Sequence, residues 1–182
     1  MQPQPSTRLR PGTATEEHAI RPDLRVVTTP RSGPLFRSLG VVTAALILAG
    51  GYVHWCLYRQ GYRTIPKIGV GFLFQVVASV IVAAALLLGP RCIARMGHVT
   101  DRFAGAVIGL AAAALAAGTL VAFALTRTPG GLFKFQERGL QPAPQALFAL
   151  VAEAGVLVVL GGWMVADHVG RQAVRTVPMG PV

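Results

Sequence analysis

Four long runs of apolar residues, separated by short polar stretches, organise this sequence. Alanine, leucine, valine and glycine fill each run, without the spacing of an amphipathic soluble helix or the alternation of a half-exposed strand. Each run is close to the ~20 residues that a helix needs to cross ~30 Å of hydrocarbon. We therefore predict an all-α integral membrane bundle of four transmembrane helices, with spans at about residues 38–58, 69–89, 103–125 and 145–166.

The stretches between and around the runs set the predicted boundaries. Pro90 is expected to end the second span, because proline lacks the backbone N–H that continues a helix. Residues 1–36 are rich in proline, threonine and arginine and show no hydrophobic periodicity, so they are predicted to be a disordered, basic tail. Residues 37–167 then form the transmembrane domain, and residues 168–182 form a short second tail.

Composition and charge support a membrane protein over a soluble one. Hydrophobic residues make up 53% of the 182 positions and charged residues only 13%, whereas soluble domains carry about 25% charged residues. The net charge of +10 arises in the tails and loops, where basic side chains meet anionic lipid headgroups. No basic face with interleaved aromatic residues occurs, so the predicted partner is the lipid bilayer and not nucleic acid. Another membrane protein or a second copy of the chain remains open as a partner.

The distribution of arginine and lysine predicts the orientation. The two tails and the loop between the second and third spans carry more of these residues than the other two loops. The positive-inside rule therefore places both termini in the cytoplasm. The loops around residues 59–68 and 126–144 then share the outer face. In this topology Cys56 and Cys92 fall on opposite sides, so no disulfide between them is expected.

Three side chains with an imidazole, amide or carboxyl group lie well inside the predicted spans: His54, Gln75 and Glu153. At ~1.5 Å of rise per residue, they lie roughly 7 to 12 Å below the predicted outer ends of their helices. Polar residues at such depth normally face the bundle interior and one another. Gly50, His54 and Tyr58 share one helix face. We hypothesise a polar pocket in which His54 and Glu153 meet, together with Gln75 and Tyr58, beneath the outer loops.

Two interpretations of this pocket stay open. The His54–Glu153 pair has the chemistry to move a proton, to bind a cation or to hold the polar head of a quinone or lipid. Alternatively, it is a hydrogen bond that only holds helices together, or His54 is a wetted interface residue like Tyr52 and Trp55. Bis-histidine haem ligation needs a second histidine at this depth, and the sequence has none. No cofactor or metal is predicted.

The outer loops offer a second set of candidate contacts. Arg59, Arg63 and Lys67 are placed to reach lipid phosphates, an anionic ligand or a partner. The 126–144 loop alternates large apolar residues with charges and is expected to lie along the membrane surface. Within it, Glu137 is expected to pair with an arginine of the first outer loop, which would tie the two hairpins together.

Small residues mark the predicted helix contacts. Gly50 lies on the His54 face, and Gly105 and Gly109 form a G-x-x-x-G motif in the third span. Such glycines allow close packing within a bundle or between protomers. No P-loop, G-x-G-x-x-G, nucleophile elbow or H-E-x-x-H motif occurs, so no catalytic residue is predicted.

The stretch GGYVHWCLYRQGYRTIPKIGVGFLFQ, followed by TPGGLFKFQERG and a glutamate in the fourth span, resembles an uncharacterised family of membrane proteins. These are small four-span proteins of high-GC Gram-positive (actinobacterial) bacteria, and the arginine-rich basic set fits that origin. The resemblance covers about residues 38–167. It implies the four-span topology and a plasma-membrane location with the outer face outside the cell, and it carries no activity.

The sequence thus favours a non-enzymatic accessory or sensing subunit with a polar pocket under its extracellular loops. A small transport or proton-coupled component is one alternative, although the inner halves of the spans offer no ionisable residues to continue a path. A quinone- or lipid-binding protein associated with redox chemistry is the other.

Overall fold

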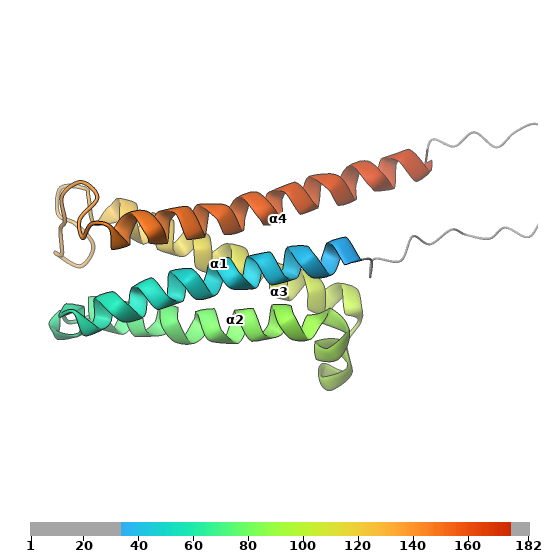
Figure 1. Cartoon of the computed structure of the whole chain (residues 1–182), viewed down its shortest axis with the longest axis horizontal. Helices are drawn as coiled ribbons and strands as arrows, with labels where there is room; N and C mark the ends of the chain where they lie inside the picture. The colour runs from blue at the N-terminus through green and yellow to red at the C-terminus, as the bar shows by residue number, and fades with distance from the viewer. Residues whose placement is uncertain (1–33, 176–182) are drawn as a thin grey trace, which may run out of the picture. The chain divides into compact units, whose positions relative to one another are not determined.

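The computed structural model describes residues 34–175, which form four long α-helices and one short 3-10 turn (Figure 1). The elements are α1 (Pro34–Arg59), η1 (Tyr62–Thr64), α2 (Ile68–Gly97), α3 (Asp101–Leu125) and α4 (Gln145–Arg175). Each helix contains a segment of 23 to 30 residues that is long and apolar enough to cross a membrane. The predicted all-α architecture with four spans is confirmed, and the chain is a multi-pass membrane protein. Residues 1–33 and 176–182, on which most of the predicted tails fall, lie outside the described residues.

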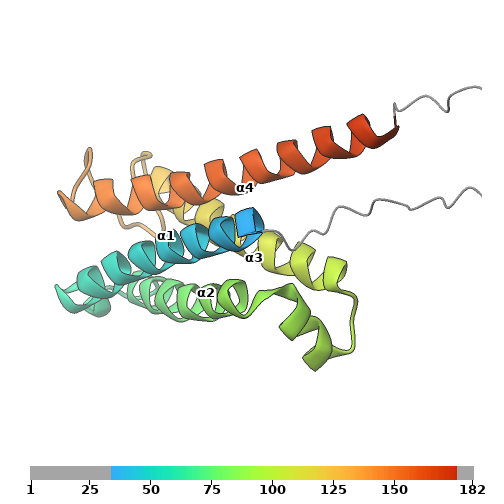
Figure 2. The same cartoon turned by 45° about the vertical axis from the view of Figure 1, so that its right-hand side comes forward.

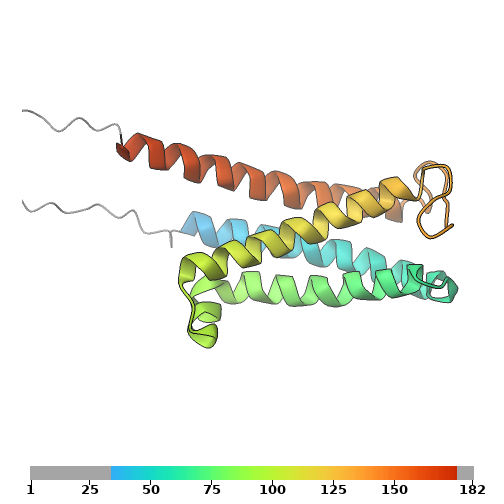
Figure 3. The same ribbon diagram turned by 180° about the vertical axis from the view of Figure 1, so that it is seen from behind.

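The helices pack as a ring in which each one contacts two neighbours. α1 packs against α2 and α4, and α3 closes the ring against the same two helices. Figure 3 shows that α3 starts beside α2 and then runs away from it toward the 126–144 loop. α2 and α3 therefore meet at one end of the bundle and separate at the other.

Alanines form much of the centre of the bundle, and many large apolar side chains lie on its outside. All four helices contribute to the buried core, which consists of Ala44, Ile47, Ala83, Ala112, Ala116, Val156 and Leu160. Val70, Leu110 and Val158 are among the large apolar residues that face outward. Inside a bilayer the hydrophobic effect does not drive helices together, because lipid tails are as apolar as the side chains. Close packing, which small residues allow, therefore holds the bundle together. The outward apolar residues are the surface that contacts lipid.

α2 is bent at Gly89 and Pro90. Gly89 has φ 78° and ψ 158°. This backbone conformation is not helical, and residues other than glycine rarely adopt it. The predicted end of the second span thus falls at a break in the backbone, but the chain resumes a helix and continues to Gly97. This is possible because proline is well tolerated in the first turn of a new helix, where no backbone N–H is needed. Figure 2 shows this short segment turned aside from the bundle.

η1 and the 126–144 loop lie together at the opposite end, which we call the loop end (Figure 1). The loop folds back on itself through paired backbone hydrogen bonds of 2.9 Å between Leu132 and Phe135. The N–H of Glu137 then donates to the carbonyl of Thr126 at 3.0 Å. These bonds return the chain to the end of α3, so that the loop covers the bundle.

Candidate functional site

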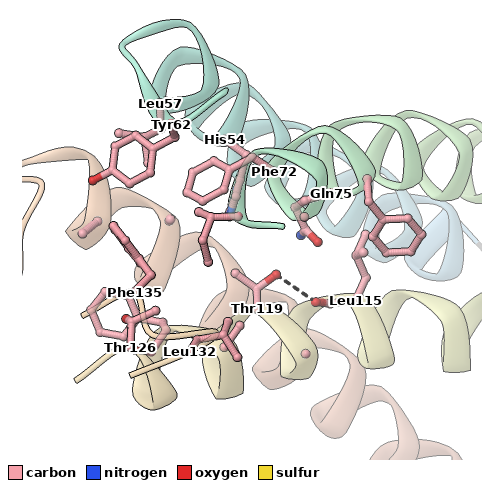
Figure 4. Close-up of a pocket in the computed structure, with 18 of the residues that line it drawn as sticks. His54, Leu57, Tyr62, Phe72, Gln75, Leu115, Thr119, Thr126, Leu132 and Phe135 are labelled. Carbon is pink, nitrogen blue, oxygen red and sulfur yellow. Dashed lines mark hydrogen bonds between the residues drawn. The ribbon is translucent and has the colours of Figure 1, made fainter. Parts of the chain in front are cut away.

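A cavity of about 560 Å³ lies between α2 and α3 and continues under the 126–144 loop (Figure 4). This volume is within the range of small-molecule sites, roughly 300–1,000 Å³. In the membrane-spanning part its walls are apolar, with Phe74 and Ala78 from α2 and Ala111, Ala114 and Gly118 from α3. Phe74, Ala114 and Gly118 are exposed, so the cavity opens sideways toward the surrounding lipid.

The polar lining of the cavity lies nearer the loop end. His54 from α1, Gln75 from α2 and Thr119 from α3 reach it from three helices, as Figure 4 shows. Tyr62 of η1 and Arg127 with Glu137 of the 126–144 loop line it above them. The cavity is therefore amphiphilic along its length.

His54 is buried, with 9% of its surface exposed, and is held by its own helix. Its Nδ1 lies 2.8 Å from the carbonyl oxygen of Gly50. Because a carbonyl only accepts, Nδ1 carries a hydrogen, and in the neutral form of the ring Nε2 is then an acceptor. The ring also packs against Phe72, with centroids 5.1 Å apart. Among the described residues no side chain hydrogen-bonds to Nε2.

Glu153 is almost completely buried, with 1% of its surface exposed. Gln75 Nε2 donates to Glu153 Oε1 at 3.1 Å, which joins α2 to α4 across the bundle. α1 lies beside this bond at Gly50, where an added Cβ would lie 2.7 Å from Glu153 Oε1. Glycine at this position leaves room for the carboxylate. Gln75 is thus the link between Glu153 and the cavity.

The proposed cluster of four residues is brought together only in part. His54 bonds to the carbonyl of Gly50, and the Glu153 carboxyl lies beside the same glycine. In the described part of the chain, residues 34–175, His54 and Glu153 do not hydrogen-bond to each other. Tyr58 stacks on Trp55, with ring centroids 5.9 Å apart, and lies outside the cavity lining.

The basic residues around the turn between α1 and α2 lie apart from one another. Arg59 lies over the ring of Trp55, at 5.9 Å from its centroid, and Arg63 is exposed. Lys67 lines the cavity mouth, where its Nζ lies 5.3 Å from the centroid of Phe133. Of the three, Lys67 is the one that the structure places at the cavity.

The G-x-x-x-G glycines are not in tight contact in the described chain. A Cβ added at Gly105 would meet Pro90 at an ordinary 3.6 Å, and one added at Gly109 would meet nothing within 4 Å. Contact between protomers through this face stays a prediction.

Tyr62 and Glu137 join η1 to the 126–144 loop at the loop end. The Tyr62 hydroxyl donates a hydrogen bond to Glu137 Oε1. Arg127, from the same loop as Glu137, forms an ion pair with Oε2 at 3.3 Å. The expected partner from the first outer loop was an arginine, and the structure shows a tyrosine in that role. Burial raises the pKa of Tyr62 above its usual range, and the bond to Glu137 raises it further, so the hydroxyl stays a neutral donor.

Arg127 is the centre of this arrangement. Its guanidinium lies 3.5 Å from the ring centroid of Phe123. It donates to the carbonyl oxygens of Gly139 at 3.0 Å, Phe123 at 3.4 Å and Gln141, and to the hydroxyl of Thr126. The cation is thus neutralised by Glu137 and its donors are used by the loop itself.

Sequence reasoning missed Tyr62, Arg127 and Thr119 as lining residues. Thr119 carried a usable signal, since it is a polar residue inside a predicted span. Tyr62 and Arg127 carried none, because their role depends on a loop that folds back over the bundle.

Comparison with protein-family models, with curated proteins and with solved structures gave no significant match. Within residues 34–175, no three His, Cys, Asp or Glu side chains gather in a way that could hold a metal ion.

Proposed function

We propose that this protein binds an amphiphilic, lipid-class ligand and acts as a non-enzymatic accessory or sensing subunit of the plasma membrane. The observation that carries the proposal is the cavity itself, which is apolar where it borders the lipid and polar toward the loop end. A ligand with a long apolar chain and a small polar head matches both parts at once.

The sideways opening supplies the route. Phe74 and Gly118 lie on opposite walls and are both exposed, so a chain dissolved in the bilayer passes between α2 and α3 without crossing water. The head group then reaches His54 and Gln75, while the 126–144 loop covers it. Burial of the apolar chain supplies little energy when lipid is the solvent, so the polar contacts give the selectivity.

The excess of basic residues in the tails and in the loop between α2 and α3 supports an orientation with both termini in the cytoplasm. The loop end then faces the outside of the cell, and the cavity accepts its ligand from the outer leaflet.

The core supports binding in preference to conduction. Beyond Glu153, α4 contributes Val156 and Leu160 to a close-packed apolar core shared by all four helices. A transported ion or proton needs polar groups or water along its path. The polar part of the cavity ends at this core, which favours a ligand that enters and leaves from one leaflet.

The proposal is tested by filling the cavity. An added Cβ at Gly118 meets nothing within 4 Å, so Gly118→Leu places a side chain in the opening between α2 and α3. Gly161→Leu is the matched control, because Gly161 is an exposed helical glycine with equally open surroundings and lies outside the lining. Lipids that copurify with each protein are measured by native mass spectrometry.

Wild type and Gly161→Leu are expected to retain one ligand per chain, and Gly118→Leu is expected to lose it. Equal lipid content in all three proteins would contradict the proposal. Circular dichroism checks that each variant keeps its helices.

A further inference from the structure

Most of the hydrogen-bond donors in the polar part of the cavity are already used by the protein. Gln75 Nε2 donates to Glu153, and the Thr119 hydroxyl donates to the carbonyl of Leu115 at 3.0 Å. The Tyr62 hydroxyl donates to Glu137. His54 Nδ1–H donates to Gly50. The Thr119 and Tyr62 hydroxyls and His54 Nδ1 have therefore used their only hydrogens within the chain, and the Gln75 amide has used one of its two.

Acceptors remain on the same side chains. His54 Nε2 and Gln75 Oε1 have no hydrogen-bond partner among the described residues, and Thr119 Oγ1 keeps its lone pairs after donating to its own helix. Figure 4 shows these three residues around one part of the cavity. An acceptor that a bound ligand covers without giving it a hydrogen bond costs about 1–3 kcal/mol. The polar part of the cavity is therefore suited to a group that donates hydrogen bonds.

The charges disfavour an anionic head. Arg127 is paired with Glu137 and surrounded by loop carbonyls, so it offers no free charge to a phosphate. The other cation in the lining, Lys67, is exposed at the mouth, where water and salt weaken its attraction. An anionic head placed beside His54 Nε2 and Gln75 Oε1 would meet lone pairs instead of donors.

We propose that the ligand carries an uncharged hydroxyl head, as in a long-chain alcohol or a hydroquinone, which donates to His54 Nε2 and Gln75 Oε1. This inference rests on the proposed function and specifies its ligand class. A quinone or an ether of the same shape accepts hydrogen bonds only, so it leaves both acceptors unpaired. The site distinguishes a donor head from an acceptor head on the same apolar chain.

Three probes with one chain test the head group: geranylgeraniol, its methyl ether and geranylgeranyl phosphate. Each is titrated into the full-length protein in nanodiscs, and affinity is measured from the rise in unfolding temperature with ligand mole fraction. The alcohol is expected to bind on the order of tenfold more tightly than the ether, and more tightly than the phosphate.

Variants assign the contact. His54→Phe keeps a ring against Phe72 and removes the acceptor, so the affinities for alcohol and ether should become nearly equal. Thr119→Val, which removes a neighbouring oxygen with little change of shape, should lower the preference as well and serves if His54→Phe does not fold. Tyr58→Phe is the matched control on the same helix and should leave the preference unchanged.

If the ether or the phosphate binds as tightly as the alcohol, the proposed preference for a hydroxyl head is wrong, and the proposal that the protein binds an amphiphile still stands. The same conclusion follows if none of the probes binds while wild type still copurifies a lipid that Gly118→Leu loses. If no probe binds and Gly118→Leu changes nothing, the proposed function fails as well.

Discussion

Gln75 on α2 and Glu153 on α4 are joined by a hydrogen bond of 3.1 Å that crosses the bundle past Gly50 of α1. α2 and α4 are not neighbours in the ring of helices, which makes this bond a link across its diagonal. Gln75 is also part of the cavity wall. The arrangement of the buried carboxyl and the shape of the polar part of the site are therefore coupled through one amide.

The first prediction concerns this pair. A double-mutant cycle of Gln75→Leu and Glu153→Leu should give a coupling of about 1 kcal/mol, typical of a hydrogen bond between membrane helices. The cycle is measured by equilibrium unfolding in mixed SDS micelles. His54→Ala with Glu153→Gln should be close to additive, because no hydrogen bond joins these residues in the described chain. Strong coupling in the second cycle and none in the first would contradict the observed arrangement.

Gly50 provides the second prediction. Gly50→Ala places a Cβ at 2.7 Å from Glu153 Oε1, so the carboxyl must move and its bond to Gln75 must weaken. We expect a loss of about 1–2 kcal/mol in the same unfolding assay. Gly161→Ala, whose Cβ meets nothing within 4 Å, should be neutral or slightly stabilising, because alanine favours a helix over glycine. Equal effects of the two substitutions would show that no close contact exists at Gly50.

The third prediction concerns the bond between the hairpins. Tyr62→Phe removes the donor to Glu137, so hydrogen exchange in residues 128–141 should become about fivefold faster, as the loss of ~1 kcal/mol implies. Tyr58→Phe is the control, because Tyr58 stacks on Trp55 outside the cavity. If the loop exchanges at the same rate in Tyr62→Phe as in wild type, the bond does not hold the loop.

The same bond gives a pH dependence. The pKa of Tyr62 is raised in the folded protein, so the contribution of this group to stability is complete below the unfolded value of ~10. It is lost as the pH rises above that value toward the folded pKa. Loop protection should therefore be insensitive to Tyr62 ionisation below pH ~9 and should fall above pH ~10. Tyr62→Phe should lack this fall, and an identical fall in the variant would exclude Tyr62 as its source.

The orientation is tested with the native cysteines. Cys92 is exposed at the end of the bundle away from the loops, and Cys56 is half-buried. In a Cys56→Ala background, Cys92 should react with an impermeant maleimide only after the cells are opened. With both cysteines replaced by alanine, Arg138→Cys in the exposed part of the 126–144 loop should react in intact cells. The reverse pattern would invert the proposed topology.

The sequence by itself determined the number and type of the helices. Lipid offers no hydrogen-bond partners to the backbone, so each apolar run of membrane-spanning length forms a helix, which satisfies its backbone hydrogen bonds within the run. It also indicated His54, Gln75 and Glu153 as residues inside the spans, because a polar residue in an apolar run is visible without any knowledge of its neighbours. The break of α2 at Pro90 was visible for the same local reason, although the resumed helix was not.

Only the tertiary structure decided which of these residues meet. Whether Glu153 contacts His54 or Gln75 depends on how each helix is rotated about its axis and on how α1 and α4 cross near Gly50. The residue pattern within a single span specifies neither the rotation nor the crossing. Tyr58 shares a helix face with His54, yet its ring stacks on Trp55. Tyr62, Arg127 and Glu137 meet because the 126–144 loop folds back over the bundle. Contacts between residues far apart in the chain arise from packing, and packing made the cavity whose polar end these residues cover.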